Sequence, residues 1–213
     1  MELQGDFSEE EFRKACAELE NPASDGKVWE SLVESESFNI YQMLDEQSGF
    51  YDYKAFGDFK DCSPSLYAEV YMDLEYRKQW DAYVKELYEQ EICGKMVIYW
   101  EVKYPFPVAN RDYVYIRDGR DLNLNGRTVR VILAKSFSTP EIPEKYGVIR
   151  VSDYRQSLVI ESNGKEGCKV SMFYHDNPGG TIPTWLVNWI AKNGVPNFLH
   201  DIQKACQNYP KKT

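Results

Sequence analysis

The fold is decided by the stretch Met96-Val97-Ile98-Tyr99-Trp100-Glu101-Val102-Lys103-Tyr104. Every even-numbered position in it is apolar or aromatic, whereas the odd-numbered positions turn charged at Glu101 and Lys103. An alternation with a period of two residues is typical of a β-strand that buries one face. The predicted strand carries the large ring of Trp100 on its buried face.

A second aromatic strand is predicted after Pro105-Phe106-Pro107, which cannot continue a central strand. In Asp112-Tyr113-Val114-Tyr115-Ile116, two tyrosines share one face and two aliphatic side chains share the other. Other parts of the chain can therefore cover both faces of the sheet. Few residues of the types that commonly catalyse reactions lie beside these rings. This composition favours a protein that binds a molecule over an enzyme that cleaves one.

The bulk composition indicates one domain over residues 1–213 and disfavours two kinds of partner. No linker rich in Ser, Gly or Pro divides the 213 residues. The formal net charge of −9, without a basic cluster, argues against nucleic acid and against firm docking on anionic membranes. A weak basic tail at Lys211 and Lys212 remains an alternative to a simple solvated end.

Cysteine usage and hydropathy predict a cytoplasmic protein. The five cysteines are odd in number and form no Cys-x-x-Cys pair, which is typical of a reducing compartment. The N-terminus lacks the apolar core of a secretory signal. The densest apolar run, residues 185–191, is interrupted by Asn188 and is far shorter than the roughly 20 residues that cross a bilayer.

Two helices are predicted in the N-terminal half. Ser8 as N-cap and Glu11 three residues later make a capping box at the start of the first helix. Ser63 before Pro64 predicts the start of the second helix, because proline fits the first helical position. The apolar spacing keeps its helical character toward Leu87.

The strands are predicted to pair as antiparallel neighbours. A hairpin of residues 38–44 and 50–59 follows a short apolar patch around Trp29. Asn125-Gly126 and Asn163-Gly164 separate later runs, and Asn-Gly supplies the positive φ angles that tight hairpin turns need. The later strands are predicted over residues 97–104, 113–121, 128–137, 148–161 and 169–175.

A long C-terminal helix completes the expected α+β fold. It is predicted to begin near Thr181, after Asp176-Asn177-Pro178-Gly179-Gly180 stops the last strand, and to kink at Pro196. Its apolar face, which includes Trp185 and Trp189, is wide enough to be mostly buried. We therefore expect the helix to lie across the concave face of the sheet.

The sequence offers little for catalysis or metal binding. His175 and His200 have no second ligand at a metal-binding spacing, and there is no serine-hydrolase elbow or phosphate-binding glycine loop. We predict no catalytic residues, no metal site and no enzyme activity. An enzyme would need a titratable group inside a cavity, and the candidates Glu101 and Asp153 fall on the polar side of their strands.

Arg77 and Asp81 are the polar pair that stands out. Their four-residue spacing puts a guanidinium and a carboxylate on one helical face. One interpretation is a surface ion pair worth about 0.2–0.5 kcal/mol. The other is an arginine at the mouth of an apolar cavity, whose fork of donors binds an anionic headgroup while Asp81 orients it.

Trp100, Tyr113 and Tyr154 are the aromatic candidates for a cation-binding site. Electron-rich ring faces attract a quaternary ammonium, which has no N–H to donate. The alternative is that these rings are plain core, the commoner role of an aromatic side chain on an inward strand face. Residue spacing leaves both interpretations open.

Several blocks of sequence, in one order along nearly the whole chain, resemble the START (StAR-related lipid transfer) family. Such a set is far more specific than any single motif. The blocks are Asp73-x-x-Tyr76-Arg77-x-x-Trp80-Asp81, Val102-Lys103-Tyr104-Pro105-Phe106-Pro107, Asn110-Arg111-Asp112-Tyr113-Val114-Tyr115, Asp176-Asn177-Pro178-Gly179-Gly180 and Lys192-Asn193-Gly194-Val195-Pro196.

The resemblance implies a helix-grip fold, in which a curved antiparallel sheet and a long C-terminal helix enclose a hydrophobic tunnel for one phosphatidylcholine. It implies that Arg77 binds the phosphate with Asp81 as its partner. It also implies that the three aromatic candidates cage the choline, with Tyr71 and Gln156 as second-rank candidates near the headgroup. No cofactor is expected. The implied lipid-binding residues are Arg77, Asp81, Trp100, Tyr113, Tyr154, Tyr71 and Gln156.

The resemblance also implies a carrier that exchanges phosphatidylcholine between membranes. We expect a tunnel lined by residues such as Leu158, Ile132 and Leu186, with the C-terminal helix around Gly194 and Pro196 as its gate. The carrier is expected to be a monomer that contacts membrane surfaces transiently. The alternative function is a lipid-sensing adaptor that regulates an unidentified protein partner when phosphatidylcholine is bound.

Overall fold

The computed structural model describes residues 6–210, so the predicted basic tail at Lys211 and Lys212 lies outside the described residues. Strands and helices occur in separate runs, as expected of an α+β fold. They are α1 (Glu9–Glu18), β1 (Glu30–Glu34), β2 (Phe38–Leu44), β3 (Tyr51–Phe59), α2 (Pro64–Met72), α3 (Leu74–Trp80), β4 (Val84–Ile92), β5 (Lys95–Val102), β6 (Arg111–Leu124), β7 (Arg127–Ser136), β8 (Ile149–Val151), β9 (Tyr154–Ser162), β10 (Cys168–Asp176), α4 (Thr184–Trp189), the π-helical turn η1 (Ile190–Gly194) and α5 (Val195–Asn208).

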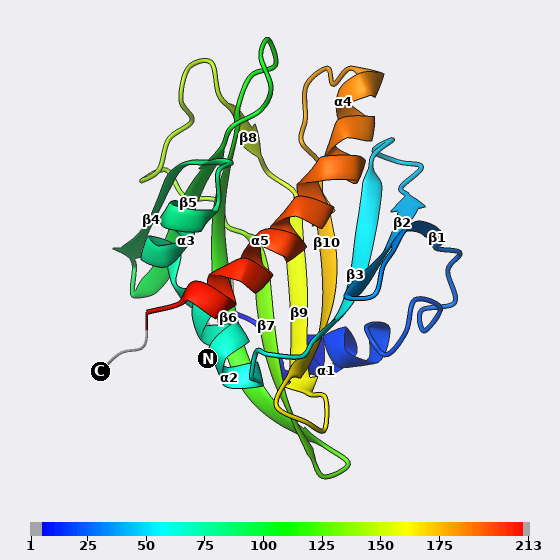
Figure 1. Cartoon of the computed structure of the whole chain (residues 1–213). Helices are drawn as coiled ribbons and strands as arrows, with labels where there is room; N and C mark the ends of the chain where they lie inside the picture. Colours follow the sequence, from blue (N-terminus) through cyan, green and yellow to red (C-terminus); the bar gives the residue numbers. More distant parts are fainter. Residues whose placement is uncertain (1–5, 211–213) are drawn as a thin grey trace.

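One curved sheet organises the described part of the chain. Its strands run in the order β1-β2-β3-β10-β9-β7-β6-β5-β4, each antiparallel to its neighbours, and β8 pairs with β6 in parallel. Figure 1 shows α4, η1 and α5 as one long helix lying across this sheet. The predicted α+β fold with a C-terminal helix gripping the sheet is confirmed.

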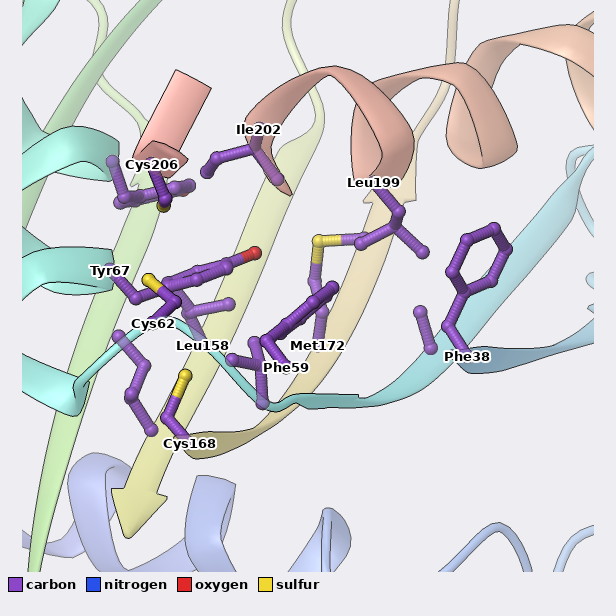
Figure 2. Packing of buried hydrophobic residues seen from close by; sticks show 14 of the residues in the cluster. Phe38, Phe59, Cys62, Tyr67, Leu158, Cys168, Met172, Leu199, Ile202 and Cys206 are labelled. Carbon is purple, nitrogen blue, oxygen red and sulfur yellow. The ribbon is translucent and has the colours of Figure 1, made fainter. Parts of the chain in front are cut away.

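Both faces of the aromatic strands are covered, as their alternation predicted. On one face, Val97 and Tyr99 of β5 pack in a cluster with Phe12 of α1. On the other face, Ile98 and Trp100 of β5 pack in a cluster with Leu74 of α3. Figure 2 shows Leu199 and Ile202 of α5 above the sheet, in the same buried cluster as Leu158, Met172 and Phe59.

The predicted helix starts and the first hairpin agree with the structure. Ser8 and Glu11 form a complete capping box, and Ser63 caps α2 with Pro64 in its first turn. The first hairpin consists of β2 and β3, in close agreement with its predicted residues. The apolar patch around Trp29 includes Leu32 and Val33, which lie in β1, an edge strand that the sequence did not reveal.

The prediction that the second helix continues toward Leu87 is wrong. The helical segment ends at Trp80, and Val84–Ile92 forms the edge strand β4 instead. Cys93 and Gly94 both adopt positive φ angles, 51° and 76°, and turn the chain back so that β4 pairs with β5. Pairing across that turn overrides the helix-favouring Lys, Glu and Gln side chains of this segment.

The predicted strand over residues 148–161 is in fact two strands. The chain leaves the sheet at Ser152 and Asp153, between β8 and β9. The carbonyl oxygen of Asp153 accepts a hydrogen bond from the backbone N–H of Asn177 at 2.9 Å, and Ser136 Oγ accepts one from the N–H of Tyr154 at 3.0 Å. These long-range bonds satisfy the backbone at the break.

The C-terminal helix, which we call the lid helix (residues 184–208), differs from its prediction in two respects. The irregularity before Pro196 is the π-helical turn η1, where the Asn193 side-chain amide donates to the carbonyl oxygen of Trp189 at 3.1 Å. Trp185, predicted on the buried face, is 48% exposed. The prediction of a single domain over residues 1–213 stays a prediction.

Candidate functional site

A cavity of about 160 Å³ lies between the lid helix, α3 and the aromatic strands. Trp100 and Val102 of β5 and Met172 of β10 supply its sheet side, and Ile190, Val195 and Phe198 supply its lid side. Its lining also includes Tyr53, Arg77, Trp80, Asp81, Tyr83, Lys103, Tyr104, Tyr113, Gln156, Tyr174, Asp176, Trp189, Gly194 and Asp201.

Arg77 and Asp81 form a buried ion pair at this cavity. The helical spacing of α3 and its end at Asp81 place the two side chains together, with Nε of Arg77 3.0 Å from Oδ2 of Asp81. Each residue is only 9% exposed, so the interpretation as a surface ion pair is wrong. Burial is the largest single influence and lowers the pKa of Arg77, but the attraction of Asp81, together with the effects of nearby tyrosines, raises that pKa overall.

Hydrogen-bond donors remain available around Arg77. Its link to Asp81 uses Nε, and its terminal nitrogens donate to no side chain or backbone oxygen within residues 6–210. The indole N–H groups of Trp80 and Trp100 are buried and also lack a partner in that range. Buried donors without a partner are rare in folded proteins, so a group of them at one cavity indicates a site for a ligand with oxygen acceptors.

The structure brings the three aromatic candidates together. The rings of Trp100 and Tyr113 stack at 4.6 Å, and Tyr113 meets Tyr154 edge-on at 5.3 Å. The guanidinium of Arg77 lies 4.7 Å from the Trp100 ring. Trp100 and Tyr113 line the cavity, whereas Tyr154 is buried next to them.

Of the two second-rank candidates, Gln156 reaches the cavity and Tyr71 does not. Gln156 lines the cavity, and its Oε1 accepts a 2.7 Å hydrogen bond from the hydroxyl of Tyr154. Tyr71 of α2 is buried in the cluster between the sheet and α5. Burial raises the pKa of Tyr71 to about 12, and the nearby Arg77 opposes part of that increase.

Sequence reasoning missed several lining residues, one of which is Asp176. Its Oδ2 accepts hydrogen bonds from the hydroxyls of Tyr113 at 2.6 Å and Tyr174 at 2.9 Å. The only signal in the sequence was the position of Asp176 at the end of a strand, in front of Asn-Pro-Gly-Gly. Trp80 and Phe198 were missed because they reach the cavity from separate helices.

A model of the START domain matches residues 9–212. The chain belongs to the START family. The START family predicted from the sequence blocks is thereby confirmed.

Sequence relatives of this START chain carry lipid-transfer names. It is 63% identical over 209 residues to the phosphatidylcholine transfer protein of Homo sapiens, and the match covers 98% of this chain and 98% of that protein. It is 31% identical over 193 residues to the human StAR-related lipid transfer protein 7, mitochondrial, a match that covers 87% of this chain and 52% of that protein.

A solved START structure has the same fold. The crystal structure of human STARD10 superimposes with a TM-score of 0.82 at 23% identity, covering 99% of this chain and 84% of that one. Within residues 6–210, no helix is both long and apolar enough to cross a bilayer.

The tunnel lining predicted for this START chain is not observed. Leu158, Ile132 and Leu186 are fully buried, but none of them lines the cavity. Leu199 and Ile202 of α5 share a buried cluster with Leu158 and Ile132 and fill the space below the lid helix (Figure 2). The cavity therefore comprises the polar and aromatic end of the interior alone.

The two candidate catalytic carboxylates lie away from the cavity. Glu101 is buried on the opposite face of β5, where it pairs with Lys85 at 3.2 Å and accepts from Asn110 at 3.1 Å. Asp153 has a side chain that is 60% exposed and contacts His175. Across the described residues, no group of three His, Cys, Asp or Glu side chains could hold a metal ion. The prediction of no enzyme activity stays a prediction.

Proposed function

We propose that the protein binds one phosphatidylcholine molecule between the sheet and the lid helix and exchanges it between membranes. The observation that carries the proposal is the buried Arg77, which sits beside the Trp100 and Tyr113 rings in a chain 63% identical to a phosphatidylcholine transfer protein. A buried guanidinium with free donors and stacked aromatic rings beside it match the two charges of a phosphocholine headgroup.

The phosphate is assigned to Arg77. Its terminal nitrogens and the indole N–H groups of Trp80 and Trp100 offer donors without partners among the described residues. Asp81 keeps the guanidinium charged and fixes its orientation through the 3.0 Å bond to Nε. Because every phospholipid carries a phosphate, this contact supplies affinity and leaves headgroup choice to the remaining residues.

The choline is assigned to the rings of Trp100, Tyr113 and Tyr154. Cation–π attraction is worth about 2 kcal/mol when the cation is desolvated, which corresponds to a preference of roughly thirtyfold. Trp100 and Tyr113 now contact each other at 4.6 Å. A cation held by all three rings therefore requires these side chains to move apart when the headgroup enters.

The acyl chains require a larger movement. Exposing some thirty methylenes to water would cost on the order of 20 kcal/mol, so free lipid does not leave a membrane unaided. The cavity of about 160 Å³ is smaller than pockets for drug-sized ligands, which hold about 300–1,000 Å³. The lid helix must therefore move away from the sheet during loading, and its Leu199 and Ile202 must give way to lipid (Figure 2).

Exposed aromatic side chains support transient contact with a membrane. Phe106 and Tyr146 are almost fully exposed, and Trp185 is 48% exposed. They belong to the β5–β6 loop, the β7–β8 loop and α4, which lie at one end of the molecule (Figure 1). Aromatic rings at a water–hydrocarbon boundary are a common membrane anchor.

The proposed carrier is a cytoplasmic monomer that uses no cofactor and no nucleic acid and catalyses no reaction. No feature of residues 6–210 favours the alternative function of a lipid-sensing adaptor that regulates an unidentified protein partner.

Transfer of labelled lipids between donor and acceptor vesicles tests the proposal. Phosphatidylcholine is compared with phosphatidylethanolamine, phosphatidylserine and cholesterol. We expect rapid movement of phosphatidylcholine and much slower movement of the others. Movement of none of them, or of cholesterol alone, would overturn the proposed function.

A further inference from the structure

Asp176 places a further carboxylate on the cavity wall, connected to Arg77 through two aromatic rings. It is the last residue of β10 and lines the cavity. A chain of contacts links the two charged groups: Arg77 lies 4.7 Å from the Trp100 ring, which stacks on Tyr113 at 4.6 Å. The Tyr113 hydroxyl in turn donates to Asp176 Oδ2 at 2.6 Å. The stacked rings of Trp100 and Tyr113 therefore connect the Arg77–Asp81 pair to the carboxylate of Asp176.

The carboxylate of Asp176 has neutral hydrogen-bond partners. Its Oδ2 accepts from the phenols of Tyr113 and Tyr174, and no Lys, Arg or His side chain among the described residues lies within ion-pair distance of it. His175, the preceding residue, contacts Asp52 and Asp153 instead. A carboxylate at a cavity that lacks a cationic partner is expected to attract a cationic ligand group.

We propose that Asp176 is a specificity-determining residue that attracts the positively charged nitrogen of the lipid headgroup. This proposal rests on the proposed function and deepens it. The aromatic rings favour a cation through their faces, and Asp176 adds a full negative charge at the end of the same site. The site then selects phospholipids with a cationic headgroup nitrogen over phospholipids with a neutral headgroup, such as phosphatidylglycerol.

The ionisation behaviour of Asp176 agrees with this role. Burial raises its pKa, while the hydrogen bonds from Tyr113 and Tyr174 act in the opposite direction. A cation bound next to the carboxylate stabilises its charged form. The headgroup and the protein therefore satisfy each other's charge in a place that is largely screened from water.

The alternative is that Asp176 only holds Tyr113 in position. Asp176→Asn separates the two roles, because the amide oxygen can still accept from both tyrosines while the negative charge is lost. A charge role predicts loss of headgroup discrimination, whereas a positioning role predicts that Asp176→Asn retains it. Asp153→Asn is the matched control, since Asp153 is a neighbouring carboxylate that does not line the cavity.

The experiment compares transfer of phosphatidylcholine and phosphatidylglycerol by the parent protein, Asp176→Asn and Asp153→Asn. Thermal unfolding confirms that each variant folds, and Asp176→Ser provides a second neutral variant if Asp176→Asn does not. We expect the phosphatidylcholine-to-phosphatidylglycerol ratio to fall about tenfold in the neutral Asp176 variant, because the attraction between two opposite charges a few ångströms apart in a partly screened site is lost. Asp153→Asn should keep the parent ratio.

The outcomes separate this proposal from the proposed function. Failure of the parent protein to transfer phosphatidylcholine overturns the proposed function itself. Transfer by the parent, with an unchanged ratio in the neutral Asp176 variants, overturns the role of Asp176 and leaves the carrier function standing. A fall of the same size in Asp153→Asn also overturns it, because the effect would then reflect the overall charge of the protein.

Discussion

Arg77 shows how a single side chain acquires its role from its surroundings. Its guanidinium is held between the carboxylate of Asp81, the ring of Trp100 and the ring of Phe198 at 5.4 Å. Removing it altogether would leave Asp81 buried without a cation, which typically costs 3–5 kcal/mol. An alanine variant would therefore mix a folding defect with a binding defect.

Arg77→Lys is the cleaner test of the phosphate assignment. Lysine keeps the positive charge beside Asp81 but lacks the planar fork that binds two phosphate oxygens at once. We expect transfer of every phospholipid to fall at least about tenfold, with headgroup preference retained. Vesicle transfer assays measure both quantities. A lysine variant as active as the parent would contradict the assignment.

Trp80→Phe tests the unpartnered indole donors. The substitution removes the indole N–H and replaces the bicyclic ring with a smaller aromatic one, without the loss of an existing hydrogen bond. We expect a modest loss of unfolding free energy from the missing ring atoms and a several-fold slower transfer of all phospholipids by the folded protein. Trp29→Phe is the control, because the Trp29 indole N–H donates to Asp25 away from the cavity. It should destabilise the protein and leave transfer by the folded fraction unchanged. Unaltered transfer by Trp80→Phe would mean that its N–H does not meet the lipid.

At the scale of elements, the lid helix is the part that must move. It joins the sheet through a buried cluster that includes Leu199 and Ile202, and it contacts α3 and the start of β4 through pairs such as Trp80–Phe198 at 5.8 Å. The π-helical turn η1 lies in the middle of the lid helix, next to the cavity. Such turns occur often at functional sites, where they interrupt the regular hydrogen-bond ladder.

Fixing the lid helix to the sheet should stop lipid exchange. Tyr83 and Asn197 are suitable positions, because Nδ2 of Asn197 lies 3.4 Å from the Tyr83 hydroxyl. Cysteines at both positions, in a Cys93→Ser background that removes the exposed native thiol, can be joined by a cleavable bismaleimide. We expect exchange to be lost on cross-linking and recovered on cleavage. Exchange that continues in the cross-linked protein would rule out the lid helix as the gate.

The β5–β6 loop is expected to touch the membrane through Phe106. Phe106→Ala should leave stability unchanged, because the side chain is already in water. Moving a phenylalanine side chain from water to hydrocarbon is worth about 1.5–3 kcal/mol, so vesicle binding should weaken roughly tenfold. Val28→Asn, which changes an exposed apolar side chain between α1 and β1, is the control for sedimentation with phosphatidylcholine vesicles. Equal binding by both variants would exclude this loop as an anchor.

At the scale of the whole molecule, His175 links segments that are far apart in the sequence. Its Nδ1 lies 2.6 Å from Asp52 of β3 and its Nε2 3.0 Å from Asp153, in front of β9. The hydrogen bond with Asp52 is the largest influence and raises the pKa of His175 to about 9, against the effect of burial and with help from Asp153. The imidazolium is therefore present at neutral pH.

Stability should decrease with rising pH on account of His175. A histidine whose pKa is raised by folding stabilises the protein fully below its ordinary value of about 6.5, and that contribution is lost as the pH rises through about 9. At about 1.4 kcal/mol per pKa unit, the contribution is on the order of 3 kcal/mol. Urea unfolding at pH 6.5, 8 and 9.5 measures it. His175→Gln should flatten this dependence, and an equally steep decline in that variant would assign the effect to other groups.

The sequence by itself determined the α+β class, the aromatic rows around Trp100 and Tyr113, the family and the helical spacing of Arg77 and Asp81, because each depends on short-range periodicity or on local blocks. Only the tertiary structure decided that β4 is a strand, since pairing with β5 outweighs its local helix preference. Tertiary packing also decided that Arg77 is buried. It likewise decided that Asp176 accepts a hydrogen bond from Tyr113, because these two residues are 63 positions apart in the sequence. The burial and the charge of side chains at the cavity depend on distances across the fold, and those distances cannot be read from residue spacing along the chain.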